Sequence, residues 1–260
     1  MSVVPRKAIA TAKAREVIRN LNILEPDEID VEAIANYYNV GVRRQRLSGM
    51  DGCILRKGDN AVITVREDIR YIPQQRFVIA HELGHYFLHP NTRQAETVSQ
   101  EQTSNWSEKN VEEYEANLFA ADLLMPPQMF AQRHSEHEPS LGLIESLARE
   151  FSTTLTSTAV QFTLSTREEC AIVVSKNRQR IWAMKSPGFS FQLLEDGYVH
   201  GHSCAEECRK IGQPARSDQV EASFWLKGFF GDHKSAITED SRYFTRLQRT
   251  LTLLWIHEQI

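Results

Sequence analysis

The sequence HELGH at residues 81–85 constrains the fold of this chain more than any other feature. An α-helix turns by about 100° per residue, so two histidines four positions apart lie on one face and can bind a single cation. Pro73 suits the first turn of a helix, Pro90 ends the run, and the stretch 73–89 between them is apolar on nearly every side. The pattern therefore predicts a buried helix that carries a metal site.

Glu82 cannot ligate the same cation as His81 and His85, but it lies beside that position on the helix. A carboxylate there can take a proton from water whose pKa a bound cation has lowered to about 7, which predicts metal-assisted hydrolysis with Glu82 as the general base. The competing interpretation is a pair of core histidines whose hydrogen bonds are satisfied. Gly84 costs a helix about 1 kcal/mol relative to Ala, so we expect a neighbouring segment, such as a strand, to pass close to it.

His89 continues the four-residue spacing from His81 and His85. Each step of four residues rotates the side chain by about 40°, so three such histidines cannot reach one small ion without distortion. We therefore expect His89 to support the site or the core and not to ligate the metal.

The segment 110–125, NVEEYEANLFAADLLM, predicts a second helix that ends before two prolines. A catalytic zinc usually has three protein ligands, so one more is needed. Glu113 is in phase with Ala116 on a stripe of small residues that we expect to pack on the HELGH helix, which makes Glu113 the candidate ligand. Asn117, one turn later, is placed to orient a ligating histidine. A solvated helix face is the alternative for the acidic residues here, and it is the better interpretation of Glu112.

The run QQRFVIAHELGHYFLH and the later run EEYEANLFAADLLMP together resemble the ImmA/IrrE family of metallopeptidases, whose hallmark is an HExxH helix followed by a helix ending in a FAxxLLMP-like sequence. The resemblance covers most of residues 1–165. It implies that His81, His85 and Glu113 bind zinc and that Glu82 is the general base. It also implies a regulatory protease that cleaves a partner repressor of the helix-turn-helix type. The sequence leaves open whether Mn²⁺ replaces Zn²⁺.

The charge and the apolar segments of the chain limit its partners. A formal net charge of −4 provides no overall cationic field for a phosphate backbone, so direct binding to nucleic acid is disfavoured. The start of the chain lacks the apolar region of a signal peptide, and no stretch approaches the roughly 18 apolar residues of a membrane helix. We therefore expect a cytoplasmic protein that does not bind membranes, with its four cysteines as free thiols.

The first third of the chain predicts helices at 8–22 and 31–38 and extended runs at 40–47, 53–56 and 61–66. We expect the three extended runs to form a small antiparallel sheet just before the HELGH helix. The run 61–66, AVITVR, is the candidate edge strand that pairs with an extended substrate peptide, and a plain core strand is the alternative.

The polar segment 91–108 separates the two predicted metal helices. It is rich in Gln, Ser, Thr and Asn, so we expect it to be mobile. A lid over the site with Trp106 as an apolar anchor is one interpretation, and an inert surface loop is the other.

Residues 128–165 are expected to be helical and to pack against the peptidase core. A DNA-reading helix-turn-helix is the weaker alternative, because its second segment, LTSTAVQFTL at 155–164, has no Arg, Lys or Asn to contact base edges. From about Cys170 the pattern changes to short apolar runs at 170–175, 179–184, 189–194 and 251–256.

The fold class expected for the whole chain is α+β. It consists of a zincin-like peptidase domain at 1–165, with a small antiparallel sheet plus active-site helices, and a smaller α+β or mostly β domain at 166–260. The second domain is predicted to sense a signal or to dock a partner.

One further cluster falls in the second domain. His200, His202, Cys204 and Cys208 lie close enough in sequence to bind a second metal or to form a redox switch. Their spacing is not that of a zinc ribbon, so an ordinary loop is the alternative.

The function predicted from these features is a zinc-dependent endopeptidase that cleaves a cognate regulatory protein, a helix-turn-helix repressor, and so derepresses genes. One alternative is a regulator that sequesters its partner without cutting it and holds a structural zinc. The other is a defence or toxin component that acts on another protein by the same chemistry.

Overall fold

The computed structural model describes residues 7–57, 60–90, 110–212, 215–229 and 235–256. The chain separates into two compact units. The first comprises Met1–Arg133 and Leu147–Thr158, and the second comprises His134–Ser146 and Ala159–Ile260. Helices α7 (Leu141–Glu150) and α8 (Leu155–Ser165) therefore contribute to both units. The predicted domain boundary after residue 165 stays a prediction. The predicted lid segment 91–108, including Trp106, lies outside the described residues.

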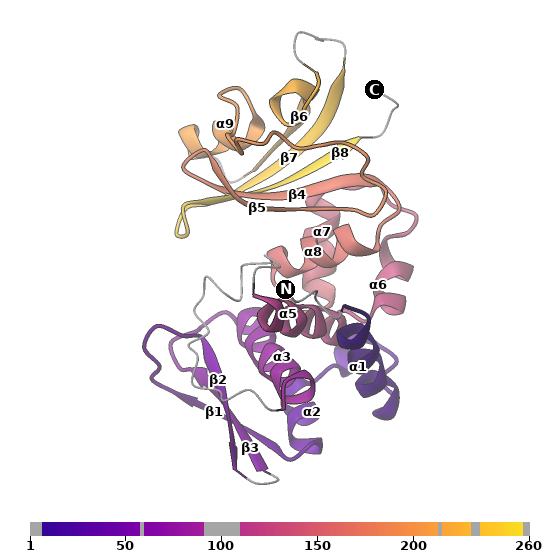
Figure 1. Ribbon diagram of the computed structural model, residues 1–260, viewed down its shortest axis with the longest axis vertical. Helices are drawn as coiled ribbons and strands as arrows, with labels where there is room; N and C mark the ends of the chain where they lie inside the picture. The colour runs from indigo at the N-terminus through magenta and orange to yellow at the C-terminus, as the bar shows by residue number, and fades with distance from the viewer. Residues whose placement is uncertain (1–6, 58–59, 91–109, 213–214, 230–234, 257–260) are drawn as a thin grey trace, which may run out of the picture. The chain divides into compact units, whose positions relative to one another are not determined.

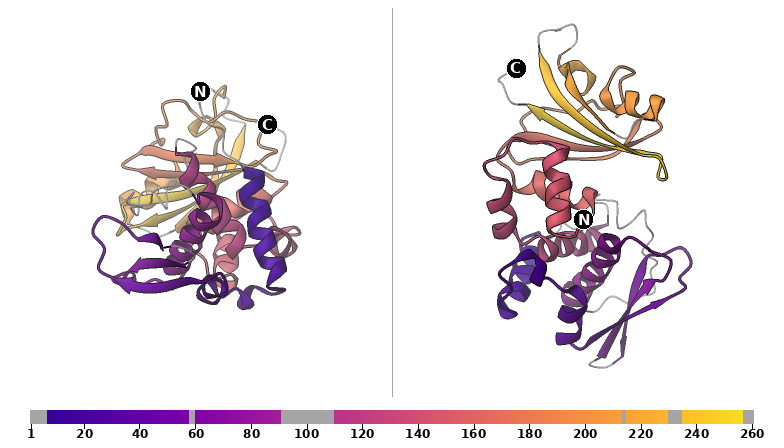
Figure 2. Two further views of the ribbon diagram at one scale, coloured as in Figure 1. Left: turned by 60° about the horizontal axis from the view of Figure 1, so that its bottom comes forward. Right: turned by 180° about the vertical axis from the view of Figure 1, so that it is seen from behind.

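The first unit combines helices with a three-stranded sheet, which Figures 1 and 2 show beside helix α3. Its elements in chain order are α1 (Lys7–Asn20), the 3₁₀ turn η1 (Pro26–Glu28), α2 (Val31–Tyr37), β1 (Val40–Gln45), β2 (Gly52–Lys57), β3 (Asn60–Arg66), α3 (Ile72–Leu88), α5 (Val111–Leu124) and α6 (Pro127–His134). The predicted helices at 8–22, 31–38, 73–89 and 110–125 are all present, with ends that differ by one or two residues.

The sheet has the strand order β1-β3-β2. Strands β2 and β3 are antiparallel as predicted, but β1 pairs with β3 in parallel, so the expectation of a wholly antiparallel sheet is wrong. Strand β3, the predicted edge strand, is the central strand. Its residues Ile63, Thr64 and Val65 are all buried, and the neighbouring strands β1 and β2 cover both of its edges. The edges of this sheet are β1 and β2.

Helices α3 and α5 lie side by side at a contact set by small residues (Figure 1). A Cβ atom on Gly84 would lie 2.9 Å from the Cα atom of Ala116, closer than such atoms normally approach. Gly84 therefore permits a close approach as predicted, but the neighbour is a helix and not a strand. The same contact explains why the small-residue stripe of α5 faces α3.

The second unit is built on a five-stranded antiparallel sheet with the order β5-β4-β8-β7-β6. Its strands are β4 (Glu169–Lys176), β5 (Gln179–Lys185), β6 (Ala215–Glu221), β7 (Ala236–Phe244) and β8 (Arg249–Ile256), with helix α9 (Cys204–Ile211) packed on β6 and β7 and the 3₁₀ turn η2 (Ala222–Phe224) between strands (Figure 1). The chain is thus α+β, as predicted.

The apolar run at 189–194 does not form a strand, unlike the runs at 170–175, 179–184 and 251–256. This segment follows Pro187-Gly188 and makes only an isolated bridge between Leu193 and Leu226. Phe189 is buried in the apolar core of the second unit, and Phe191 packs against that core. The apolar run therefore reflects burial of a loop that covers the sheet.

Candidate metal centre

Three of the predicted site residues converge in the first unit. The Nε2 atoms of His81 and His85 are 3.1 Å apart. One carboxylate oxygen of Glu113, Oε2, lies 3.2 Å from Nε2 of His81, and the other, Oε1, lies 3.2 Å from Nε2 of His85. Helix α3 supplies both histidines and α5 supplies the carboxylate. Within the described ranges this is the one group with metal-compatible geometry.

The spacing of the three residues fits a zinc ion. Zinc bonds of about 2.0–2.1 Å in a tetrahedral site place neighbouring donor atoms roughly 3.3 Å apart. The 3.1 Å between the two Nε2 atoms is close to that edge length, and each of these atoms lies 3.2 Å from a different carboxylate oxygen of Glu113. In addition, the Oε2 atom of Glu113 is buried, and among the described residues it has no hydrogen-bond partner, although Nε2 of His81 lies 3.2 Å away. The donor set of two imidazoles and one carboxylate is also typical of catalytic zinc.

Hydrogen bonds on the opposite sides of the rings orient both imidazoles. The Nδ1 atom of His81 lies 2.9 Å from Oδ1 of Asn117, which confirms the predicted position of Asn117. The Nδ1 atom of His85 lies 3.1 Å from Nδ1 of His89. Since each Nδ1 atom is engaged, each Nε2 atom is left to face the cluster. His89 points away from the three donor atoms, towards Glu115, as expected for a residue that is not a ligand.

The charges within the cluster are strongly coupled. Burial opposes ionisation of Glu113, yet the nearby His81 and His85 hold the pKa of its carboxyl group well below the usual range. Burial alone would lower the pKa of His81, but the carboxylate of Glu113 outweighs burial and raises it. Burial lowers the pKa of His85. A cation bound here would therefore replace the proton on His81 as the positive charge that neutralises the carboxylate of Glu113.

Glu82 lies next to this cluster with its side chain almost wholly buried. Its Oε1 atom makes no hydrogen bond within the described part of the chain. Burial, reinforced by Glu113 and opposed by His81, raises the pKa of Glu82 to about 7. A carboxyl group with this pKa can both accept and release a proton near neutral pH.

Strand β2 approaches the cluster from the side of Glu82. A Cβ atom on Gly52 would lie 2.4 Å from Cγ1 of Val78 and 3.3 Å from Oε1 of Glu82. Further along the strand, Arg56 donates to the carbonyl oxygens of His85 at 2.9 Å and Tyr86 at 2.7 Å. The strand is thereby fixed against the helix that carries the histidines.

The cluster lies inside a segment that matches a known family. Residues 30–163, just over half of the chain, match the model of the IrrE N-terminal-like domain, peptidase family M78. The chain belongs to the ImmA/IrrE family. The resemblance seen in the two helical motifs is thus confirmed, and membership in a metallopeptidase family agrees with a divalent metal in the His81, His85 and Glu113 cluster.

One curated protein and one solved structure are also similar to this chain. The chain is 37% identical to Metallopeptidase ImmA of Bacillus subtilis (strain 168) over 71 residues, which are 27% of this chain and 38% of that protein. The match therefore spans well under half of the relative's length. A solved structure described as a Mycobacterium tuberculosis transcriptional regulator shares the fold, with a TM-score of 0.62 and 12% identity over 95% of this chain and 76% of that chain.

The predicted cluster at residues 200–208 does not assemble as a metal site. Ser203 caps helix α9, and the helix buries Cys204 and Cys208. Burial raises the pKa of the Cys204 thiol to about 12, so this residue is a neutral thiol in this structure. The ring of His200 stacks on Phe224 with centroids 3.9 Å apart. These residues belong to the structure of the second unit.

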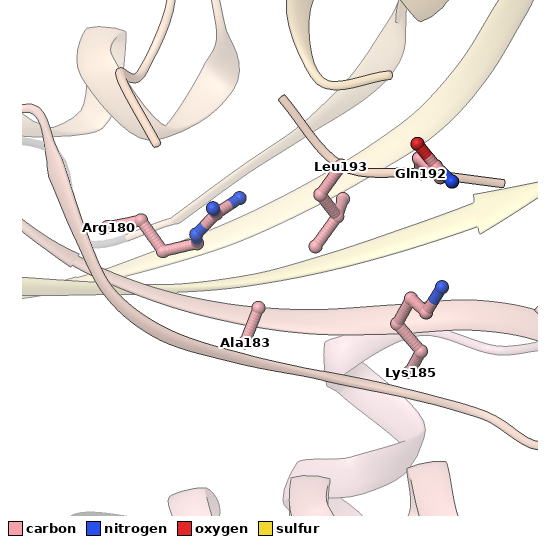
Figure 3. A pocket seen from close by; sticks show the side chains of 5 residues that line it. All are labelled: Arg180, Ala183, Lys185, Gln192 and Leu193. Atoms are coloured by element: carbon pink, nitrogen blue, oxygen red, sulfur yellow. The ribbon is translucent and has the colours of Figure 1, made fainter. Parts of the chain in front are cut away.

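A hollow of about 420 Å³ also lies in the second unit, lined by Arg180, Ala183, Lys185, Gln192 and Leu193 (Figure 3). A register shift between β4 and β5 leaves Ile181 unpaired, which brings Arg180 onto the face of Ala183 and Lys185. The Nζ atom of Lys185 donates to the carbonyl oxygen of Phe191 at 2.9 Å. None of the residues predicted to do chemistry lines this hollow.

Sequence reasoning missed three features of the site: the approach of Gly52 to Glu82, the contact of Arg56 with α3, and the pairing of His89 with Glu115. The first two depend on the position of β2, which the sequence predicted only as part of an antiparallel sheet. Within the described ranges, no helix combines the length and apolar character that a membrane span requires.

Proposed function

We propose that this chain is a zinc-dependent endopeptidase that cleaves a cognate regulatory protein, a helix-turn-helix transcriptional repressor, and so derepresses genes. One observation carries the proposal: the imidazoles of His81 and His85 and the carboxylate of Glu113 converge as a possible metal site beside Glu82, a buried carboxyl group without a hydrogen bond to Oε1 among the described residues. A structural zinc site needs no such group. The four cysteines are free, which agrees with action in the reducing cytoplasm.

In this proposal His81, His85 and Glu113 hold the zinc ion. When bound, zinc supplies a Lewis acid that polarises the peptide carbonyl and acidifies water. Glu82 takes a proton from the attacking water and then delivers it to the nitrogen of the leaving amine. Burial raises the pKa of Glu82, and a raised pKa makes its carboxylate a stronger base for the first transfer.

The substrate in this proposal binds as an extended strand along β2. This strand is an edge of the three-stranded sheet, and its residue Gly52 adjoins Oε1 of Glu82. An added strand would satisfy the main-chain groups of the edge and would run past the general base. Leu55, with 52% of its surface exposed, offers an apolar contact to such a peptide.

The test is to incubate the purified protein with a candidate helix-turn-helix repressor, with zinc and with or without a chelator. The proposal predicts two repressor fragments that form only without the chelator and that do not form with Glu82→Gln protein. Intact repressor in a stable complex would instead establish a sequestering regulator. An intact, unbound repressor together with cleavage of another cellular protein would point to a defence component.

A further inference from the structure

A row of buried polar groups leads from the metal cluster into the interior of the first unit. It starts at His85, whose Nδ1 atom lies 3.1 Å from Nδ1 of His89. The other ring nitrogen of His89, Nε2, lies 3.0 Å from Oε2 of Glu115. The side chains of His89 and Glu115 are each 2% exposed. The row therefore connects the last turn of α3 with α5 away from solvent.

An ionised carboxylate at Glu115 would set the direction of every hydrogen bond in the row. Such a carboxylate can only accept, so Nε2 of His89 would then carry the proton that it donates to Glu115. In a neutral imidazole the other nitrogen then has a lone pair, and Nδ1 of His89 accepts. His85 must consequently donate from Nδ1. Its Nε2 atom is left with a lone pair directed at His81 and Glu113, which is the tautomer that a metal ligand needs.

We propose that His89 and Glu115 are positioning residues that hold His85 in its metal-binding tautomer. The proposal rests on the metal site of the proposed function. In this proposal helix α5 supports the two ligating histidines in different ways. The amide of Asn117 contacts His81 directly, whereas the carboxylate of Glu115 acts on His85 through the imidazole of His89. Helix α5 thus orients both rings in addition to supplying Glu113.

The test compares His89→Phe, Glu115→Leu and the double variant with the full-length wild-type protein. The zinc dissociation constant is measured by competition with a chromophoric chelator, and the stability of the metal-free protein by chemical unfolding. Each single variant should bind zinc about 10- to 100-fold more weakly, the usual effect of losing a group that supports a ligand. The double variant should bind no more tightly than His89→Phe.

The stability of the double variant should change in a different way from its zinc affinity. This difference distinguishes a positioning role of His89 and Glu115 from a role in packing alone. The double variant removes both partners of one buried hydrogen bond, so it should recover stability relative to the single variants. His89→Gln is the conservative variant: its amide can accept from His85 and donate to Glu115, so zinc affinity should return to within a few fold of wild type. If a single variant does not fold, the double variant and His89→Gln decide the question.

His134→Phe is the matched control. Counted over the whole residue, His134 and His89 are each 4% exposed. The Nε2 atom of His134 lies 2.9 Å from the hydroxyl oxygen of Ser165 in the second unit. His134→Phe should cost stability without changing zinc affinity. Unchanged zinc binding in His89→Phe and Glu115→Leu, or restored binding in the double variant, would overturn the positioning role alone. A wild-type protein that binds no zinc would overturn the proposed function as well.

Discussion

Glu82 in the first unit and Glu239 in the second are buried to nearly the same extent, with 2% and 0% of their surfaces exposed, yet their surroundings differ. Burial raises the pKa of both carboxyl groups. Glu239 accepts hydrogen bonds from the backbone N–H of Ala205, the indole of Trp225 and the hydroxyl of Ser241. For Glu82, by contrast, Oε1 has no partner among the described residues.

This difference distinguishes a structural carboxylate from one available for chemistry. Glu239 ties the first turn of α9 to β7, and its donors compensate for its burial. Glu82 lacks that compensation, although an unsatisfied buried polar atom costs about 1–3 kcal/mol. This cost has a functional explanation if Oε1 of Glu82 accepts a hydrogen bond from the water molecule that gives up a proton in the reaction. Four predictions test this comparison.

The largest effect is expected from Glu82→Gln. Loss of a general base should reduce repressor cleavage by about 10²- to 10⁴-fold. Zinc content should not change, because Glu82 is not a ligand, and stability should be at least that of wild type. Activity, zinc content by metal analysis and unfolding are measured on one preparation. Cleavage at the wild-type rate would remove Glu82 from the mechanism.

The same substitution at Glu239 should give the opposite result. A glutamine amide there turns N–H groups towards existing donors, so Glu239→Gln should lower the free energy of unfolding by about 1–3 kcal/mol. Cleavage per folded molecule and zinc content should stay at wild-type values. The comparison fails if Glu82→Gln is the destabilised variant and Glu239→Gln is the inactive one.

Gly52→Ala tests whether strand β2 must lie so close to Val78 and Glu82 of helix α3. The new Cβ atom would lie 2.4 Å from Cγ1 of Val78, so the strand must shift, at a cost of about 1–3 kcal/mol in unfolding free energy. We expect slower cleavage with zinc still bound. Gly41→Ala in β1 of the same sheet is the control, since its nearest contact would be an ordinary 3.8 Å to Val62. Equal effects of the two variants would argue against a role for the close approach.

The smallest effect concerns Glu206, a third buried carboxylate, in α9. Its hydrogen bonds with Arg209 lower its pKa from 4.5. A lowered pKa means that the folded state binds fewer protons, so this stabilisation is present above about pH 4.5 and is lost as the pH falls through the folded-state value. Chemical unfolding from pH 6 to pH 3 should therefore show a steeper loss for wild type than for Glu206→Gln. Parallel curves would contradict the assignment.

The helices of the site could be predicted because their signals are local. Prolines mark the ends of the two helical runs, and the phase of Glu113 with Ala116 indicated which carboxylate faces the histidines. Glu115 could not be found in this way. It lies about 200° around the helix from Glu113, so helical periodicity places it on another face. Its contact with His89 depends on how the last turn of α3 passes α5.

The errors in the sheets have a similar origin. The strand order that makes β3 central depends on a parallel pairing between distant segments, which alternation along one strand does not encode. Strand β6 is largely exposed and polar, so it has no hydrophobic signal. Helix α9 has a signal of another kind: Ser203 followed by Glu206 is the pattern of a capping box, which predicts a helix where the metal-cluster interpretation did not expect one.

The central claim is that the donor atoms of His81, His85 and Glu113 hold one metal ion beside Glu82. Anomalous diffraction at the zinc absorption edge, from crystals grown with zinc, tests it most directly. We expect a peak bounded by the Nε2 atoms of His81 and His85 and the carboxylate of Glu113. A zinc-saturated crystal with no peak there, or with its peak on other residues, would contradict it.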